Sequence, residues 1–278
     1  MEEFTHGALR IAHRTMGHGP VHVLAFHGYG GSTADFAPLF PTLAGTVTLH
    51  AFDIWFNGHS RWPEGRPVSQ PLRPEELRDL MAAYMDRHGI GHAYYMGFSL
   101  GGRLALTLAE HLPQRSLGAL LLAPDGLVRH PWYRWLSRFA WGRALYRGFQ
   151  GRPGPWFAAL DALHAVGLVR PKRYAFLRYH TDDRARRQLV HDVWLSLRLL
   201  EPDLRRAAAH MRRTGRKLHL YMGRYDSVVK LRWGRRLLRR APDVTDLTVL
   251  ETGHIVVTPA LARRLKESED LWTVDQRP

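Results

Sequence analysis

Short apolar strands alternate with helices along much of this 278-residue chain, and this alternation limits the fold more than any other feature. Strands are predicted at 21–26, 46–52, 92–96 and 117–123, with helices between them. The last of these segments, LGALLLA, is apolar on both faces, as a strand covered on both sides should be. We therefore expect an α/β fold with a mostly parallel central sheet and helices on both of its faces.

The middle of the chain differs in composition from its flanks. Residues 126–215 show no strand of comparable quality and read as four or five helices. They carry 18 basic and 6 acidic residues, whereas residues 1–125 have a net charge of −2. After Gly215 the alternation resumes with strands at 217–222 and 246–250. This shift predicts a core of residues 1–125 and 211–278, interrupted by a helical insertion at 126–210.

A possible nucleophile lies where a predicted strand turns into a helix. The segment Gly97-Phe98-Ser99-Leu100-Gly101 fits the pattern G-x-S-x-G, which is weak alone because it arises often by chance. Its position after the strand at 92–96 is the context that gives the pattern meaning. The two glycines permit a tight turn, so Ser99 is predicted to stand at the carboxyl edge of the sheet.

A serine hydroxyl needs a base, and the base needs an acid to orient it. His254 follows the predicted strand at 246–250, and Asp226 follows the one at 217–222. Both should therefore lie at the same edge of the sheet as Ser99. Asp125, which follows the strand at 117–123, competes with Asp226 for the role of the acid.

A glycine-rich turn ends the first strong strand. It reads His27-Gly28-Tyr29-Gly30-Gly31, and it lacks the spacing of a phosphate-binding loop. A tetrahedral intermediate needs about two N–H donors directed at its oxyanion. The backbone N–H groups of Tyr29 and Leu100 are the candidates; the alternative is that the turn needs its glycines only for their backbone angles.

With these residues in place, the chain resembles the α/β-hydrolase superfamily, in particular its serine-nucleophile members with a helical cap. The resemblance covers nearly the whole length. It implies that Ser99 is the nucleophile, His254 the general base and Asp226 the acid. It also implies an oxyanion hole made by Tyr29 and Leu100, and a cap formed by the insertion at 126–210. Relatives with an aspartate nucleophile, the haloalkane dehalogenases and epoxide hydrolases, do not fit Ser99.

One loop departs from the pattern of these relatives. Many of them continue the strand that ends at Asp53 as D-x-x-G-x-G-x-S. Here Phe56 replaces the first glycine, whereas Gly58 and Ser60 stand at the expected positions. Because the loop is usually structural, the departure concerns its shape and not the chemistry.

The insertion bears on the substrate. Aromatic residues of a cap would line an apolar pocket, which suggests an apolar or aromatic acyl substrate. His27, Phe98, Trp132 and Trp135 are the candidate pocket residues, although the aromatics could instead form the core of the insertion itself. The excess of arginine could favour weak association with an anionic surface, or could simply cover solvated faces. No nucleic-acid-binding motif accompanies it, so no nucleic acid partner is expected.

Composition excludes several further classes. The chain has no cysteine, which rules out disulfides, thiolate metal sites and a cysteine nucleophile. The apolar runs stay well below the roughly 18–20 residues that span a bilayer. The acidic start, Met1-Glu2-Glu3, is unlike a signal peptide, so a cytoplasmic location is expected. We expect no metal or cofactor, and a monomer or homodimer.

These observations favour a serine hydrolase that cleaves a carboxylic ester through an acyl-enzyme. Two alternatives remain open at this point. The same triad could cleave a carbon–carbon bond of a diketone-type substrate, or the fold could serve as a non-catalytic scaffold.

Overall fold

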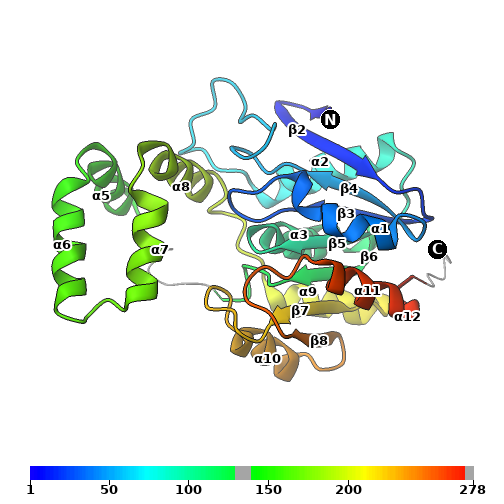
Figure 1. The fold of residues 1–278 in the computed structure, drawn as a ribbon. Coiled ribbons are helices and arrows are strands. Elements are labelled where there is room, and N and C mark those ends of the chain that lie inside the picture. Colours follow the sequence, from blue (N-terminus) through cyan, green and yellow to red (C-terminus); the bar gives the residue numbers. More distant parts are fainter. Residues whose placement is uncertain (129–138, 273–278) are drawn as a thin grey trace. The chain divides into compact units, whose positions relative to one another are not determined.

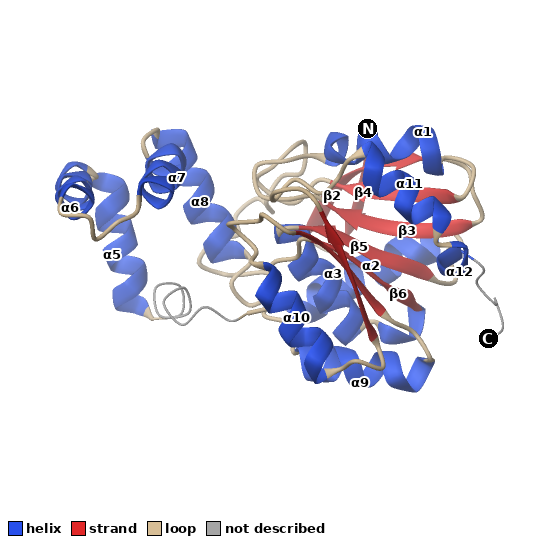
Figure 2. Cartoon of the chain, turned by 60° about the horizontal axis from the view of Figure 1, so that its bottom comes forward, coloured by secondary structure: helices blue, strands red, loops and turns tan. Residues whose placement is uncertain are grey.

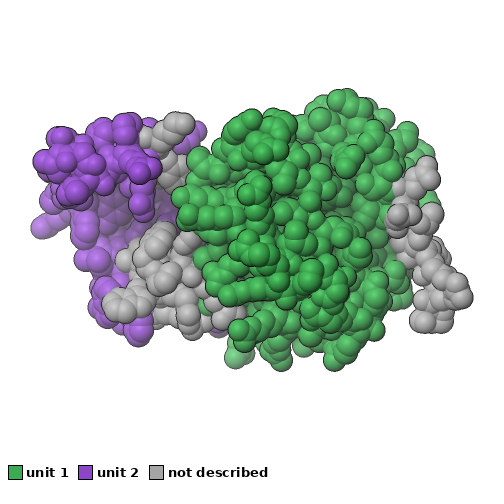
Figure 3. All heavy atoms as spheres, turned by 90° about the horizontal axis from the view of Figure 1, so that it is seen from below, with its two compact units in different colours: residues 1–65, 73–128, 200–278 green, residues 66–72, 129–199 purple. Residues whose placement is uncertain are grey.

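The computed structural model describes residues 1–128 and 139–272. Trp132 and Trp135, two of the candidate pocket residues, therefore lie outside the described residues. The chain forms two compact units, which Figure 3 colours separately. Unit 1 consists of residues 1–65, 73–128 and 200–278, and unit 2 of residues 66–72 and 129–199.

Unit 1 is built on an eight-stranded sheet with the order β1-β2-β4-β3-β5-β6-β7-β8 (Figure 1). The strands are β1 (Glu2–His6), β2 (Leu9–Met16), β3 (Val21–Phe26), β4 (Val47–Phe52), β5 (Ala93–Phe98), β6 (Ser116–Leu122), β7 (Leu218–Gly223) and β8 (Thr245–Leu250). The β1–β2 and β2–β4 pairs are antiparallel, and the remaining pairs are parallel. The six strands predicted from sequence are all present, within two residues at each end.

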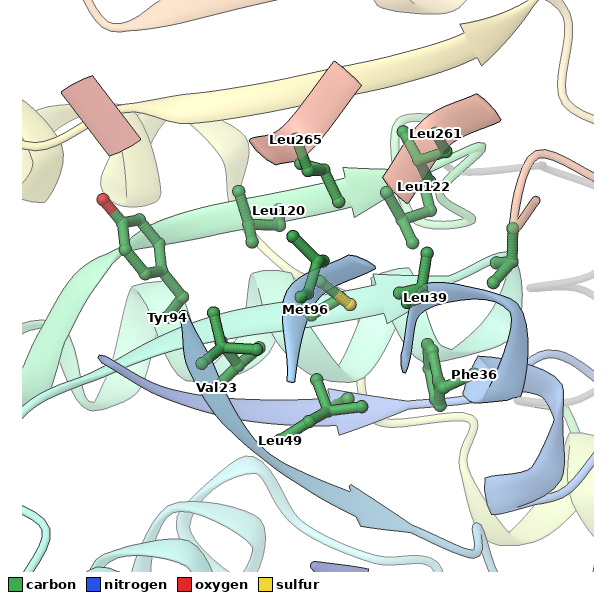
Figure 4. Packing of buried hydrophobic residues seen from close by; sticks show 14 of the residues in the cluster. Val23, Phe36, Leu39, Leu49, Tyr94, Met96, Leu120, Leu122, Leu261 and Leu265 are labelled. Carbon is green, nitrogen blue, oxygen red and sulfur yellow. The ribbon is translucent and has the colours of Figure 1, made fainter. Parts of the chain in front are cut away.

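Helices cover both faces of this sheet, as Figure 2 shows. The helices of unit 1 are the 3-10 helix η1 (Thr33–Leu39), α1 (Phe40–Leu43), α2 (Pro74–Arg87), α3 (Leu100–His111), the 3-10 helix η2 (Pro113–Arg115), α9 (Leu204–Thr214), α10 (Leu231–Arg240), α11 (Pro259–Glu267) and α12 (Glu269–Trp272). On one face, η1 and α11 pack their apolar side chains against alternate residues of the central strands (Figure 4). Against the other face, Gly234 of α10 lies over Leu220 and Met222 of β7. The predicted fold class is confirmed.

The N-terminal hairpin was not predicted from sequence. β1 and β2 pair at the edge of the sheet, where β1 is mostly exposed and β2 is buried at Leu9 and at 11–13 but exposed at Arg10, Arg14 and Thr15. Eight of their 13 residues are polar or charged, because much of an edge hairpin faces water. This composition hides the strands from a search for short apolar segments.

In the described residues unit 2 is helical, with α5 (Ala140–Gly151), α6 (Gly154–Ala165), α7 (Pro171–Thr181) and α8 (Arg184–Ser196). The segment 66–72 belongs to it, since the amide of Leu72 donates to the carbonyl of Ser196 at 2.7 Å. The role of this unit as a cap stays a prediction. No described helix combines the length and apolar character needed to cross a membrane.

The insertion expected at 126–210 is longer than unit 2. α9 begins at Leu204 and packs within unit 1, where it buries Ala207, Ala208 and Met211. The amide of Asp203, just before this helix, donates to Glu110 of α3 at 2.7 Å. A run of helices in the sequence does not reveal which of them cover the sheet, so the boundary differs by about ten residues.

Candidate active site

Ser99 lies in a strained turn between β5 and α3. Its backbone angles, φ 49° and ψ −115°, fall in a region that a non-glycine residue rarely occupies and that costs of order 1–3 kcal/mol. Three backbone hydrogen bonds hold the turn. The amide of Ser99 donates to Leu122 at 3.0 Å, and its carbonyl accepts from Gly102 at 2.9 Å and from Asp125 at 2.7 Å. The fully buried strand β5 thus delivers the serine to the carboxyl edge of the sheet.

The glycines of G-x-S-x-G are required by close packing. A Cβ atom at Gly101 would lie 1.9 Å from the carbonyl oxygen of Phe26. One at Gly97 would lie 2.2 Å from the carbonyl oxygen of Gly101. Neither position has room for a side chain, so the sharp turn and the packing of α3 against the sheet depend on both glycines.

Ser99, His254 and Asp226 form a continuous hydrogen-bonded chain. The Ser99 hydroxyl lies 2.9 Å from Nε2 of His254, and Nδ1 of the same ring lies 2.7 Å from Oδ2 of Asp226. A carboxylate only accepts, so Nδ1 carries the proton and Nε2 accepts from the serine. The other carboxylate oxygen of Asp226 accepts from the amides of Val228 at 2.7 Å and Val229 at 2.9 Å.

The two candidate acids differ in their partners. The Asp226 side chain is fully buried, whereas that of His254 is 21% exposed. The Asp125 carboxylate instead pairs with the guanidinium of Arg103 and accepts from the amide of Gly126. The structure therefore brings Asp226, and not Asp125, to the imidazole.

The turn after β3 is held by the buried ring of His27. Its Nδ1 donates to the carbonyl of Gly28 at 2.6 Å, and its Nε2 accepts from the amide of Ile54 at 2.9 Å. Burial lowers the pKa of His27, which keeps the ring neutral and suited to both roles. The side chain has no exposed surface, so it cannot line a pocket as expected from sequence. It acts on the shape of the turn instead.

Phe98 does lie beside the reacting groups. Its ring centroid lies 5.3 Å from that of His254. The ring also packs so near to Gly28 that a Cβ atom there would lie 3.0 Å from it. Leu100 is the first residue of α3, where the backbone N–H has no partner within the helix. Tyr29 is half-buried, and burial raises the pKa of its phenol to about 12.

The loop from Asp53 to Ser60 is structural. The Asp53 carboxylate accepts from the amides of Thr33 and His59, each at 2.7 Å. The Ser60 hydroxyl donates to the carbonyl of Asp53 at 2.5 Å. Phe56, which stands where relatives have glycine, adopts φ 69°, so the loop keeps a left-handed residue at this position. Within the part of the chain that the structure describes, no three His, Asp or Glu side chains form a metal site.

Sheet, turn and hydrogen-bonded chain together define an α/β hydrolase. The profile of the family described as alpha/beta hydrolase fold matches residues 21–258, and the chain belongs to this family. The expectation of an α/β-hydrolase-type, carboxylesterase-like enzyme is confirmed.

Individual relatives agree with this assignment. A pimeloyl-[acyl-carrier protein] methyl ester esterase from Xanthomonas oryzae is 30% identical over 86% of this chain and 89% of its own length. An acetyltransferase component of the acetoin cleaving system from Cupriavidus necator is 31% identical, but over only 42% of this chain and 30% of its own. The structure of a thermophilic esterase from Thermogutta terrifontis, 17% identical, covers 95% of both chains with a TM-score of 0.66, which indicates a shared fold.

Proposed function

We propose that this protein hydrolyses a carboxylic ester through an acyl-enzyme formed on Ser99. The observation that carries the proposal is the chain from the Ser99 hydroxyl through His254 to Asp226, with both links shorter than 3 Å. These are the three groups that nucleophilic acyl transfer requires, placed in the order nucleophile, base and orienting acid.

In the first half of the reaction, His254 takes the proton of Ser99 as the hydroxyl oxygen attacks the ester carbonyl. The negative charge on the carbonyl oxygen is met by the backbone N–H groups of Tyr29 and Leu100. The imidazolium that forms is stabilised by Asp226, and it then returns its proton to the departing alcohol. A water molecule, activated by the same ring, releases the acid in the second half.

The relatives narrow the substrate class. Several are named as esterases of a methyl ester on an acyl-carrier protein, and the match spans most of both chains. We therefore place the substrate among esters of an apolar acyl chain with a small alcohol. Phe98 beside His254 supplies an apolar wall for such a group. The weak anionic-surface association, the oligomeric state and the cytoplasmic location stay predictions.

The test is the hydrolysis of p-nitrophenyl esters from acetate to palmitate by the wild type and by Ser99→Ala. The matched control is Ser268→Ala. Ser268 is remote in sequence from the site, and its hydroxyl donates a hydrogen bond to the backbone carbonyl of Arg264. A fluorophosphonate label, mapped by mass spectrometry, reports the nucleophile independently of the ester chosen. We expect Ser99→Ala to lose at least about 10³-fold in kcat and all labelling.

Each other result rejects part of the proposal. Activity that persists in Ser99→Ala would reject the nucleophile. Labelling of Ser99 without hydrolysis of any ester would reject the ester as the substrate class, and diketone-type substrates would be examined next. A protein that is neither labelled nor active would be a scaffold and not an enzyme.

A further inference from the structure

The loop that carries Tyr29 is tied to the loop after β4 by three hydrogen bonds. His27 accepts from the amide of Ile54, Asp53 accepts from the amide of Thr33, and the side-chain oxygen of Asn57 accepts from the amide of Gly30 at 3.0 Å. The third bond is the one nearest to Tyr29 in the chain. It involves a side chain that the sequence patterns did not single out.

Asn57 is itself held in one orientation. Its side-chain NH₂ donates to the carbonyl of Trp55 at 3.0 Å, and its backbone amide donates to the carbonyl of Ile54 at 2.9 Å. The residue is buried, with 5% of its surface exposed. Because the NH₂ group is used by a carbonyl, the side-chain oxygen must face the Gly30 amide. The left-handed residue Phe56 precedes Asn57 and sets the direction from which it enters.

Gly30 adds no side-chain contact of its own to the turn. Gly30 has φ +72°, and a Cβ atom built on it would meet nothing within 4 Å. Gly31 follows, so two adjacent residues have the widest range of backbone angles that a chain allows. The peptide before Tyr29, which carries the Tyr29 N–H, is held through the carbonyl of Gly28, which accepts from the amide of Gly31 at 3.1 Å and from His27 at 2.6 Å. The peptide after Tyr29 is held by Asn57, through the amide of Gly30.

We propose that Asn57 is a positioning residue for the oxyanion hole. By accepting from the Gly30 amide, it fixes the peptide that follows Tyr29, while His27 and Gly31 hold the peptide that precedes it. With both peptides fixed, the backbone angles of Tyr29 keep its N–H directed at the developing oxyanion. This inference rests on the proposed function. The N–H group gains its full interaction only when the carbonyl oxygen becomes charged, so loss of Asn57 lowers kcat and leaves KM nearly unchanged.

The experiment compares wild type, Asn57→Leu and Asn57→Ala with an ester that the wild type hydrolyses. Leucine keeps the volume of asparagine and removes the acceptor. Thr48→Val is the matched control. It removes one side-chain hydrogen bond to a loop carbonyl, that of Gly19, at the amino-terminal end of β4 and thus far from the active-site loops. Affinity for an alkyl boronic acid, which mimics the tetrahedral intermediate on Ser99, is measured beside kcat and KM.

We expect Asn57→Leu to lose about 10- to 100-fold in kcat with KM within 3-fold, and boronate affinity to fall by the same factor as kcat/KM. Thr48→Val should leave all three values within about 2-fold of the wild type. If Asn57→Leu does not fold, Asn57→Ala is judged by the same criteria.

Two results overturn the proposal. One is a kcat within 2-fold of the wild type in both variants of Asn57. The other is a lower kcat with an unchanged boronate affinity, which would show that the oxyanion hole was intact. Failure of the proposed function would give a different result. Ser99→Ala would then keep its activity, whatever kcat the variants of Asn57 show.

Discussion

The carboxylate of Asp226 lies 2.7 Å from Nδ1 of His254 and is fixed from its other side by the amides of Val228 and Val229. Both amides belong to the turn before α10, so the backbone that follows Asp226 sets the plane of its carboxylate. The plane of the carboxylate in turn sets the orientation of the imidazole ring of His254. The orientation of His254 toward Ser99 therefore depends on a buried side chain whose position is determined within three residues of sequence.

Asp226→Asn should reduce kcat by about 10³- to 10⁴-fold while the protein stays folded. The amides of Val228 and Val229 need an acceptor, so the asparagine oxygen faces them and its NH₂ group faces Nδ1. When the NH₂ group faces the ring, Nδ1 becomes an acceptor and Nε2 carries the proton, so His254 can no longer take the proton of Ser99. Steady-state hydrolysis of a p-nitrophenyl ester measures the loss.

Asp125→Asn is the matched control for this change. Its carboxylate pairs with Arg103 and not with the imidazole, so the variant should keep kcat within about 10-fold of the wild type. A larger loss in Asp125→Asn than in Asp226→Asn would reverse the assignment of the acid.

Gly101→Ala should destabilise the protein by about 3 kcal/mol or more, or prevent folding. The added Cβ would lie 1.9 Å from the carbonyl oxygen of Phe26, and backbone atoms cannot move aside without separating α3 from β3. Urea unfolding measures the change. Gly91→Ala is the control, because a Cβ there meets nothing within 4 Å, and it should stay within about 0.5 kcal/mol.

The sequence predicted those parts of the molecule that follow from local patterns. The buried strands were found because their residues are apolar on both faces. Ser99, Asp226 and His254 were found because each follows such a strand, and parallel strands carry their following residues to one edge of the sheet. What brings them into contact is the strand order, with β5 and β7 on either side of β6 and β8 beyond.

Other parts depend on contacts that no local pattern reports. Asn57 is one polar residue in a loop, and only the fold places its oxygen 3.0 Å from the amide of Gly30. His27, the first residue of the glycine-rich turn, is among the pocket residues expected from sequence. Its ring instead points into the protein, where the amide of Ile54 meets it. The relevant distances lie between residues 27 positions apart in the chain.

Phe56 keeps a left-handed backbone at a position suited to glycine, and its ring stacks on that of Trp62, with centroids 5.3 Å apart and planes inclined by 25°. The backbone angle costs about 1 kcal/mol or more, and such an aromatic pair returns about the same amount. Phe56→Gly alone should therefore change the free energy of unfolding by less than about 1 kcal/mol.

A double-mutant cycle separates the two contributions. In the Trp62→Ala background the stack is already lost, so Phe56→Gly should now stabilise the protein by about 1 kcal/mol. Urea unfolding of the four proteins gives the coupling. A coupling near zero would show that the stack does not offset the strained angle.

Four histidines, His13, His22, His50 and His88, meet beside the N-terminal hairpin, where the ring of His88 lies 6.2 Å from that of His50 and 5.8 Å from that of His13. Nε2 of His50 lies 3.0 Å from Nδ1 of His22, and its Nδ1 lies 2.9 Å from the hydroxyl of Tyr84. The same hydroxyl lies 3.2 Å from Nδ1 of His13. Burial, reinforced by the neighbouring histidines, lowers the pKa of His50 to about 3, and burial also lowers the pKa values of His13 and His22.

These shifts make the protein less stable in acid. In the unfolded chain a histidine has a pKa of about 6.5. Below that pH this histidine binds a proton in the unfolded state but not in the folded state, which shifts the equilibrium toward unfolding. The contribution of His50 is intact above pH 6.5 and is lost as the pH falls toward 3. At pH 5 the loss amounts to about 2 kcal/mol from this residue alone. Urea unfolding at pH 7.5, 6 and 5 measures it.

His50→Asn should be less stable than the wild type at pH 7.5, because it disrupts the contacts with His22 and Tyr84, yet it should lose less stability between pH 7.5 and 5. His92→Gln, at an exposed position, should keep the wild-type dependence on pH. If His50→Asn and the wild type lost equal stability over this range, the acid sensitivity would have to come from other groups, and the low pKa of His50 would be wrong. Because Ser99 and His254 lie at the carboxyl ends of the strands and take no part in the hydrogen bonds of this cluster, activity measured at pH 7.5 should change far less in His50→Asn than stability does.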